Sequence, residues 1–331
     1  MFEGFNKFIN IVGYGSQGQA WVHNLSSSGW NVHLYLREAG KSFALAKQSG
    51  FNPRSLSELS GALESAAPNG TAASGAEMKV GAQIIALLCP DEEISKIYDE
   101  HLAKIDAPLI IVIAHGFAVA SGALKMRDDL HQVVLLAPKA IGPKLIQKYK
   151  EAPHHSHTLL GAVSASSESG KIALLQVAQG LGFQEQNLVW TDFEKETTGD
   201  LISEQILLCG GVFNLMAWAI EEMRDAGIPE RLIRQECLTE LELVAGLIEE
   251  KGMAAAFEKI SSAAQYGTLE VKKILDQSGL KNMFSEQVQK IRSGEFAKSF
   301  LSADWKEQHS SYIRNMRNLE KWNESTQNDK E

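Results

Sequence analysis

Residues 8–18 read Phe-Ile-Asn-Ile-Val-Gly-Tyr-Gly-Ser-Gln-Gly, a short apolar run that leads directly into a glycine-rich turn. The turn has the spacing G-x-G-x-x-G, and a helical pattern follows it over 18–28. In this context Gly13 permits a tight turn, Gly15 lets a pyrophosphate approach the backbone, and Gly18 allows close packing of helix on strand. The amino end of the helix favours the phosphate charge. The stretch predicts a strand–turn–helix unit that binds a dinucleotide; the alternative is a plain glycine-rich turn.

The rest of the first half alternates short apolar runs with helical patterns. The runs that read as buried strands are 8–12, 32–36, 83–88, 109–113, 133–137 and 159–163, and helical segments such as 92–104 lie between them. This alternation predicts an α/β domain of Rossmann type, with a parallel sheet and helices on both faces. The stretch 65–75, rich in Ala, Gly and Ser, reads as a loop.

The pattern changes near Trp190, after which the sequence carries almost no strand signal. Helices are predicted at 196–226, 229–251, 253–264, 269–276, 281–293 and 302–323. We therefore expect two domains and a short tail: 1–190 for dinucleotide binding, 191–325 as an all-α domain, and 326–331 as a frayed end.

Charge is distributed unevenly between the two halves. The net charge is −9; residues 1–190 carry 15 Lys and Arg against 16 Asp and Glu, and residues 191–331 carry 17 against 25. No basic stripe is present, which argues against nucleic acid as a partner. The three cysteines form no disulfide framework, and no signal sequence or apolar run of membrane-spanning length is found. We expect a cytoplasmic protein with no membrane partner.

Two sets of acids lie four residues apart in the predicted helices: Glu196, Asp200 and Glu204, and then Glu236 and Glu240. Acids at this spacing share a helix face and repel each other. Their neighbours are mostly apolar, and no Lys or Arg lies three or four residues from Asp200, Glu236 or Glu240. Divalent cations supply the counter-charge that such carboxylates need. The alternative is a pair of solvated acidic helix faces.

The end of the second predicted strand carries Arg37, followed by Lys41 and Ser42. A site that prefers NAD usually has an acid at this strand end to bind the ribose 2′-hydroxyl. Two cations and a hydroxyl suit a 2′-phosphate instead, so the sequence favours NADP(H). Glu38, an acid directly after Arg37, argues against NADP(H). The alternative to a cofactor site is an ordinary basic loop before a helix.

Other predicted strands end in polar groups. Asp91 and Glu92 follow one strand, His115 the next, and Lys139 the one after. Ligands in open parallel sheets bind at these ends. His115 suits general acid–base work and Lys139 suits binding of negative charge, the alternatives being a structural histidine and a surface lysine. The loop histidines His154, His155 and His157 are expected at the surface.

Six motifs together resemble ketol-acid reductoisomerase of the short form, class I. They are GYGSQG at 13–18, AHGF at 114–117, APK-x-x-G at 137–142, ETTGDLISEQILLCGG at 196–211, ECLTELELV at 236–244 and ISSAAQYG at 260–267. The resemblance covers roughly residues 11–325. It implies a Rossmann-type domain followed by a helical, knotted domain that forms a homodimer or a higher homo-oligomer with shared active sites.

The resemblance also implies roles for particular residues. Asp200 would bridge two Mg²⁺ ions per active site, Glu204 would complete one ion's ligands, and Glu236 and Glu240 would act from the second protomer. Ser261 would bind the substrate carboxylate, and the catalytic residues would be His115, Lys139 and Glu196. Contacts to NADPH are implied for Tyr14, Gly15, Ser16, Gln17, Arg37, Ser42, Asp91, Glu92, Glu93, Ile94 and Gly142; the residue pattern adds Gly13, Gly18 and Lys41.

The implied reaction has two steps on one small substrate. A 2-acetohydroxy acid, 2-acetolactate or 2-aceto-2-hydroxybutyrate, undergoes a Mg²⁺-assisted alkyl shift, and NADPH reduces the resulting ketone to the 2,3-dihydroxy acid of isoleucine and valine biosynthesis. The chain departs from the family's usual pattern at Ala118, Ala140, Ile141 and Gln265. Two alternatives stay open: a metal-independent NADP reductase of the pyrroline-carboxylate or hydroxyacid type, and a non-catalytic NADP-binding relative.

Overall fold

A computed structural model describes residues 6–65 and 82–320 of the 331-residue chain. The chain divides into two compact units, Met1–Thr197 and Thr198–Glu331, and the division falls within a helix. The predicted loop from residue 66 to 75 and the tail at 326–331 lie outside the described residues.

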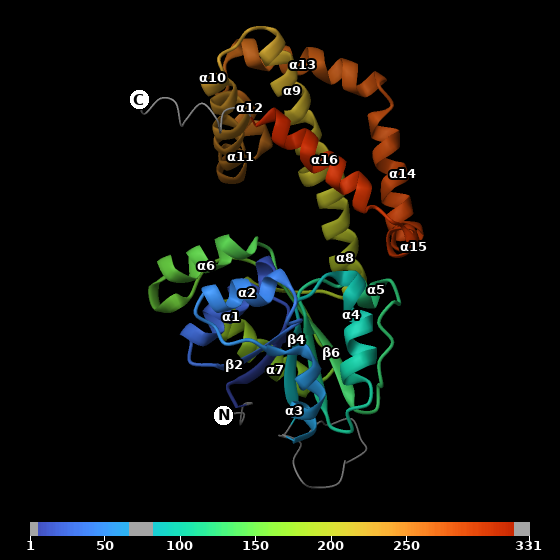
Figure 1. The fold of residues 1–331 in the computed structure, drawn as a ribbon. Coiled ribbons are helices and arrows are strands. Elements are labelled where there is room, and N and C mark those ends of the chain that lie inside the picture. Colours follow the sequence, from blue (N-terminus) through green and yellow to red (C-terminus); the bar gives the residue numbers. More distant parts are fainter. Residues whose placement is uncertain (1–5, 66–81, 321–331) are drawn as a thin grey trace. The chain divides into compact units, whose positions relative to one another are not determined.

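The first unit is built on one eight-stranded sheet (Figure 1). Its strand order is β3-β2-β1-β4-β5-β6-β7-β8, which contains the Rossmann order 3-2-1-4-5-6. Each of the six predicted runs forms a strand, and the Rossmann-type fold is confirmed. The strands are β1 (Phe8–Val12), β2 (Asn31–Leu36), β3 (Arg54–Ser55), β4 (Gln83–Leu87), β5 (Leu109–Ile113), β6 (His131–Pro138), β7 (Gly161–Ser164) and β8 (Leu188–Trp190).

Two strands depart from the predicted parallel sheet, because β7 pairs antiparallel with β6 and β8 pairs parallel with β7. Pro138 at the end of β6 pairs with Gly161 at the start of β7. The chain therefore leaves and re-enters the sheet at the same edge, and β7 must run in the opposite direction. The edge strands β3 and β8 were missed because they contain only two and three residues.

Helices cover both faces of the sheet (Figure 1). Alternate residues of a strand point to opposite faces, so Ile110 and Val112 of β5 join one core and Leu109, Ile111 and Ile113 join the other. The first core includes α1 (Ser16–Ser27), α2 (Lys41–Gln48), α6 (Gly142–Glu151) and α7 (Glu168–Leu181). The second includes α3 (Leu59–Ser65), α4 (Asp91–Ile97), the π-helical turn Tyr98–Leu102 and α5 (Phe117–Ala120).

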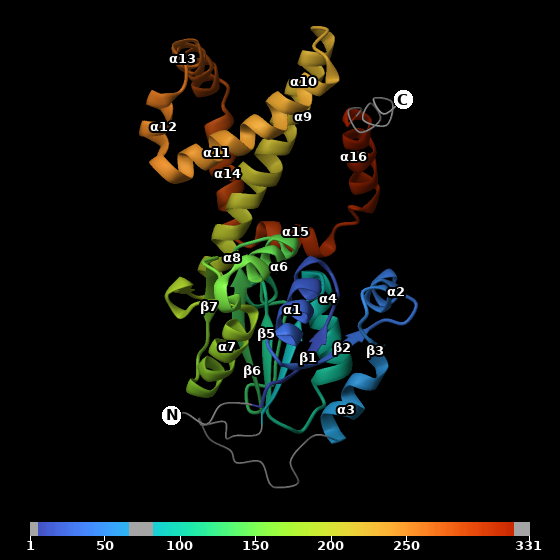
Figure 2. The ribbon, with the colours of Figure 1, turned by 90° about the vertical axis from the view of Figure 1, so that its left-hand side faces the viewer.

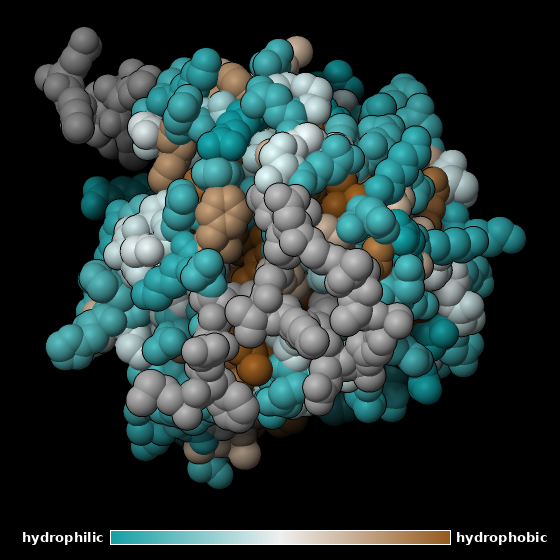
Figure 3. Space-filling model, turned by 90° about the horizontal axis from the view of Figure 1, so that it is seen from below, coloured by the Kyte–Doolittle hydropathy of each residue, from teal (hydrophilic) through white to brown (hydrophobic). Residues whose placement is uncertain are grey.

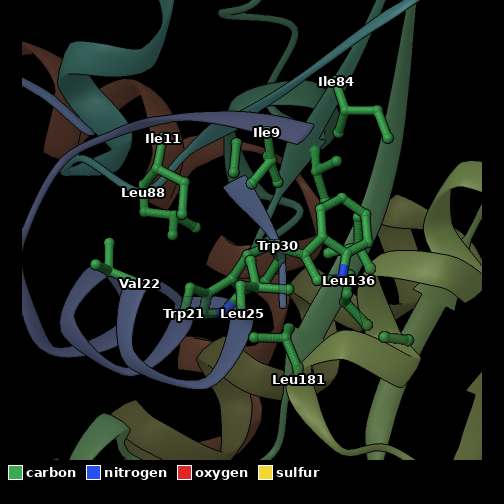
Figure 4. Packing of buried hydrophobic residues seen from close by; sticks show 14 of the residues in the cluster. Ile9, Ile11, Trp21, Val22, Leu25, Trp30, Ile84, Leu88, Leu136 and Leu181 are labelled. Atoms are coloured by element: carbon green, nitrogen blue, oxygen red, sulfur yellow. The ribbon is translucent and has the colours of Figure 1, made fainter. Parts of the chain in front are cut away.

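The first core fixes α1 against the sheet. Trp21 and Leu25 of α1 are fully buried and lie near Trp30 and Leu181 (Figure 4). Figure 2 shows α1 and α7 on the same face. Burying large side chains of this kind contributes roughly 1.5–3 kcal/mol each. The start of α1, and with it the glycine-rich turn, is therefore rigidly placed.

The second unit is helical, as predicted. Its helices are α8 (Phe193–Ile202), a π-helical segment (Ser203–Val212), α9 (Phe213–Asp225), α10 (Glu230–Arg234), a π-helical turn (Gln235–Thr239), α11 (Glu240–Lys251), α12 (Met253–Lys259), α13 (Ser262–Gln277), α14 (Leu280–Arg292), α15 (Glu295–Ser302) and α16 (Lys306–Leu319). Three predicted boundaries are wrong, one of them the start of the helix expected at 302–323, which begins at Lys306. The helix expected at 253–264 ends at Lys259, because Ser261 caps α13, and α13 includes the helix expected at 269–276. Helix α15 was not predicted.

The second unit buries few apolar side chains. Its core cluster in the described residues centres on Ile220 and Ile233. Large apolar side chains such as Trp218, 62% exposed, and Ile274, 66% exposed, face outward. The face of the molecule shown in Figure 3, by contrast, is mostly hydrophilic, with hydrophobic side chains visible mainly near its centre.

By length and composition, one helix in the described part of the chain is able to cross a membrane. It is Phe193–Asp225, with a hydropathy of 1.4 in its most apolar stretch. The sequence was expected to contain no apolar run of membrane-spanning length, and this helix reaches that length only with its interspersed polar residues included. A single such helix is weak support for a membrane span, since helices of soluble proteins pass the same test.

Candidate functional site

A cavity of about 760 Å³ opens at the carboxyl edge of the sheet. The turns after β1, β2, β4 and β5 line it, where open parallel sheets bind ligands. Most residues predicted to contact the cofactor line this cavity: Gly13, Tyr14, Gly15, Ser16, Gln17, Arg37, Ser42, Asp91, Glu92, Glu93 and Ile94, together with His115. The predicted Gly18, Lys41 and Gly142 are not among its lining residues.

The glycine-rich turn has the close approaches that its spacing predicts. Gly13 has φ +108°, and a Cβ there would lie 2.3 Å from the carbonyl oxygen of Leu88. A Cβ on Gly18 would lie 2.4 Å from the Gly13 carbonyl oxygen. A Cβ on Gly15, by contrast, would meet nothing within 4 Å. The open side of Gly15 faces no protein atom and leaves room for a phosphate to approach the backbone.

The turn after β6 is fastened to the glycine-rich turn. The Gly142 amide donates to Ser16 Oγ at 3.0 Å, and Gln17 Nε2 donates to the Ala140 carbonyl at 2.8 Å. A Cβ on Gly142 would lie 1.9 Å from the Ser16 carbonyl oxygen, so no other residue fits without a backbone shift. Gly142 does not line the cavity itself, but it holds Ser16, which does.

Arg37 at the end of β2 forms an ion pair with Glu93 of α4. Lys96 Nζ lies 3.1 Å from the other carboxylate oxygen of Glu93. Hydrogen bonds from Arg37 and then Lys96 hold the pKa of Glu93 below its usual range. Arg37, which was predicted to bind a 2′-phosphate, therefore already has an anionic partner in Glu93.

His115 and Asp91, which follow neighbouring strands, lie together and both line the cavity. His115 Nδ1 is 2.9 Å from Asp91 Oδ2, and the imidazole stacks on Phe117. A carboxylate at Nδ1 favours a proton on that nitrogen, which leaves Nε2 as the acceptor in the neutral ring. The predicted acid–base histidine is thus oriented by an acid that the sequence had suggested only as a cofactor contact.

Glu196 of α8 is the buried acid of the site, with its side chain 1% exposed. Lys139 Nζ donates to its Oε1 at 2.6 Å, and the Gly116 amide donates to its Oε2 at 2.8 Å. A Cβ on Gly116 would lie 2.6 Å from Thr197 Oγ1, so the turn after β5 packs directly on α8. The structure brings Lys139 and Glu196 together as an ion pair with both carboxylate oxygens bound.

The other predicted metal ligands belong to the second unit. Asp200 follows Glu196 by one turn on α8, so both carboxylates lie on one helix face. Glu204 lies in the first turn of the π-helical segment, Glu236 in the π-helical turn and Glu240 at the start of α11. In the described residues Glu236 and Glu240 join no group of three potential ligands.

Ser261, the predicted substrate-binding residue, is the N-cap of α13. Its Oγ accepts a hydrogen bond from the Ala264 amide at 3.2 Å. The side chain is exposed, so its hydroxyl proton can still be donated to a ligand.

Two features were not found from the sequence. Cys89 lines the cavity, and burial raises the pKa of its thiol to about 12, which keeps it protonated. The position of Cys89 directly after the predicted strand 83–88 is the feature of the sequence that could have placed it at the cavity. His157, expected at the surface, is buried against Phe183, and this burial lowers its pKa.

Both halves of the chain match family models. Residues 5–186 match the NADPH-binding domain of acetohydroxy acid isomeroreductase, and residues 193–331 match the C-terminal domain of ketol-acid reductoisomerase. The chain belongs to the ketol-acid reductoisomerase family. The predicted enzyme class, an NAD(P)-dependent oxidoreductase with isomerase activity, is thereby confirmed.

Solved structures show the same fold. A NADH-preferring ketol-acid reductoisomerase from an uncultured archean aligns with a TM-score of 0.77 at 24% identity, over 97% of this chain and 94% of that one. An NAD-binding semialdehyde dehydrogenase protein from Cupriavidus necator aligns at 0.59 and 19% identity, over 86% and 98%. A 1-pyrroline-5-carboxylate reductase from Streptococcus pyogenes aligns at 0.57 and 11% identity, over 86% and 98%. At these identities the likeness concerns the fold alone.

Proposed function

We propose that this member of the ketol-acid reductoisomerase family converts a 2-acetohydroxy acid to the 2,3-dihydroxy acid, with NADPH and Mg²⁺ as cofactors. The substrates are 2-acetolactate or 2-aceto-2-hydroxybutyrate, as in isoleucine and valine biosynthesis. One observation carries the proposal: the buried Glu196 carboxylate, held by Lys139, lies one helical turn before Asp200. A buried acid beside further acids and a dinucleotide cavity suits a metal-assisted reductase.

The cavity residues fit a nicotinamide dinucleotide. The open side of Gly15 and the amino end of α1 suit the pyrophosphate, while Arg37 and Ser42 line the region beyond β2 where the adenosine ribose would lie. Lys41 adds positive charge at the start of α2. NADPH, when bound, supplies the hydride.

The donor set of the second site fits a hard divalent cation. Asp200, Glu204, Glu236 and Glu240 offer only carboxylate oxygens, which are the ligands that Mg²⁺ prefers. Bound Mg²⁺ would polarise the substrate carbonyl and acidify its hydroxyl. Ser261 would donate its hydroxyl proton to the substrate carboxylate.

The chain's own polar residues have separate tasks in this proposal. His115 Nε2 exchanges a proton with the substrate, while Asp91 holds the imidazole in position through Nδ1. Lys139 balances the charge of Glu196 and places a cation at the end of β6. Gly116 fixes the second oxygen of Glu196, so the carboxylate keeps one orientation during turnover.

We further propose a homodimer in the cytoplasm, with active sites shared between protomers. The exposed apolar side chains of the second unit support it, since Trp218, Leu207 and Ile274 are each more than half exposed in the single chain. Glu236 and Glu240, acting across the dimer, would then complete the metal ligands. The three free cysteines suit a reducing compartment.

The test is NADPH oxidation with 2-acetolactate, with and without Mg²⁺. We expect turnover that needs both the metal and NADPH and is abolished by EDTA. Activity that survives EDTA would instead support a metal-independent reductase. Binding of NADPH without turnover of either acetohydroxy acid would support a non-catalytic relative.

A further inference from the structure

Arg37 and Glu93 approach each other from two sides of the cofactor cavity. Arg37 follows β2, Glu93 lies in the first turn of α4, and both line the cavity. Their side chains form an ion pair, and Lys96 binds the second oxygen of Glu93. Fifty-six residues separate the two partners in the sequence, so the fold alone brings them together.

The pair contributes little to folding stability. The Arg37 side chain is 64% exposed, and exposed ion pairs are weakened by solvent and by side-chain entropy. The Glu93 side chain is 23% exposed and is held between two cations, which keep its pKa low and the carboxylate charged at neutral pH. The arrangement therefore places a fixed negative charge beside the cation that was predicted to bind a 2′-phosphate.

The two nicotinamide cofactors would meet this pair differently. A 2′-phosphate needs the Arg37 guanidinium, so it must compete with the Glu93 carboxylate and is repelled by it. A 2′-hydroxyl carries no charge and can donate a hydrogen bond to a carboxylate, as it does to the acid at the end of the second strand in NAD sites. Glu93 thus disfavours the binding of NADPH and favours the binding of NADH.

We propose that Glu93 is a cofactor-specificity residue, whose carboxylate holds Arg37 and lowers the preference of the enzyme for NADPH over NADH. The inference rests on the proposed function in one respect: the adenosine end of the cofactor lies beside Arg37. It deepens that function, because it predicts that the protein uses both cofactors.

The experiment measures dissociation constants of NADPH and NADH for the full-length protein by titration of cofactor fluorescence, which requires no turnover. We expect Glu93→Gln to increase the NADPH-to-NADH affinity ratio at least fivefold. The matched control is Glu100→Gln, which removes one negative charge from an exposed residue later in the same helical run that does not line the cavity. We expect this control to change the ratio less than twofold.

A double-mutant cycle shows whether Glu93 acts through Arg37. In an Arg37→Gln background, Glu93→Gln should increase the ratio clearly less than in the unmodified protein, because the release of the guanidinium no longer contributes and only the direct effect of the carboxylate on the cofactor is removed. Retained binding of both cofactors with an unchanged ratio in Glu93→Gln overturns the inference alone. An equal increase in the Arg37→Gln background also overturns it, since Glu93 would then act by repulsion only. Failure of the unmodified protein to bind either cofactor overturns the proposed function as well.

Discussion

The imidazole Nδ1 of His115 lies 2.9 Å from Oδ2 of Asp91, and the pair joins the residues that follow β4 and β5. Both strands end at the same edge of the sheet, so the polar side chains that follow them lie together in the wall of the cavity. The proposed acid–base group and the residue that orients it thereby come from neighbouring strand ends.

Replacing Asp91 with Asn should reduce kcat about a hundredfold, which is the range for a positioned acid–base group. The amide no longer stabilises a proton on Nδ1, so the ring loses its preferred tautomer. Steady-state kinetics across pH will show this as a lower plateau and a shifted pH–rate profile. Asp99→Asn, on the exposed side of the same helical region, is the control. An unchanged pH profile in Asp91→Asn would contradict the role.

Lys139 and Glu196 should respond unequally to mutation. Lys139→Met leaves the buried Glu196 carboxylate without its cation, which we expect to cost about 1–2 kcal/mol of unfolding free energy after allowance for solvent at Lys139, 36% exposed. Glu196→Gln leaves the cation partly solvated and should cost less than about 1 kcal/mol. Urea unfolding compares the two variants. A larger loss in Glu196→Gln would mean that the ion pair is not what stabilises this contact.

Asp200→Asn should abolish isomerisation and weaken Mg²⁺ binding, because a neutral amide is a poorer ligand for a hard cation. A readout independent of turnover is the rise in Tm on adding Mg²⁺, which reflects binding to the folded state. We expect that rise to shrink in Asp200→Asn and to persist in Asp225→Asn, an exposed acid of α9. The same Mg²⁺-dependent rise in Asp200→Asn as in the unmodified protein would argue against the metal role.

Gly142→Ala should destabilise the first unit and weaken NADPH binding together. The added Cβ would lie 1.9 Å from the Ser16 carbonyl oxygen and so displace the glycine-rich turn. Gly61→Ala is the matched control, since its Cβ would meet nothing within 4 Å and it lies within helix α3. We expect that control to be neutral or to stabilise by up to about 1 kcal/mol. Thermal unfolding and cofactor titration test both variants, and wild-type NADPH affinity in Gly142→Ala would count against the coupling.

The stability of the first unit should fall as pH drops below about 6.5. Burial lowers the pKa of His131, which accepts from Tyr98 Oη at 2.8 Å. The unfolded chain then binds a proton more readily than the folded one, so stability is complete above the unfolded pKa and decreases below it. Replacing His131 with Gln should flatten the dependence of Tm on pH between 6.5 and 5, although Tm itself falls. An unchanged slope would rule His131 out as its source.

Much of the fold could be predicted from the sequence because its signals are local. The G-x-G-x-x-G turn after an apolar run placed β1 and α1, and period and length placed the strands. The direction of β7 was not predictable, since it depends on how the chain returns from α6. The second unit was predicted as helical, but Ser261 as a cap moved two boundaries.

The candidate site was predictable in composition more than in pairing. Strand ends pointed to Arg37, His115 and Lys139, because a sheet of this kind gathers its polar residues there. Their partners, Glu93, Asp91 and Glu196, lie 56, 24 and 57 residues away in the chain. Those contacts depend on how α4 and α8 pack against the sheet. The spacing of apolar residues in the sequence does not predict that packing.

The π-helical segment Ser203–Val212 follows directly after the acids of α8 and leads into α9. A wide turn holds an extra residue, and removing one residue from a regular helix rotates everything after it by about 100°. Gly210 accommodates that turn, because a Cβ there would lie 1.8 Å from the Gln205 carbonyl oxygen. The extra residue in this segment therefore changes the rotation of α9 about the helix axis relative to α8. It fixes the direction of outward apolar side chains such as Trp218 relative to the carboxylates of α8. A one-residue insertion or deletion in this segment would therefore turn the acids of α8 and the apolar side chains of α9 relative to each other.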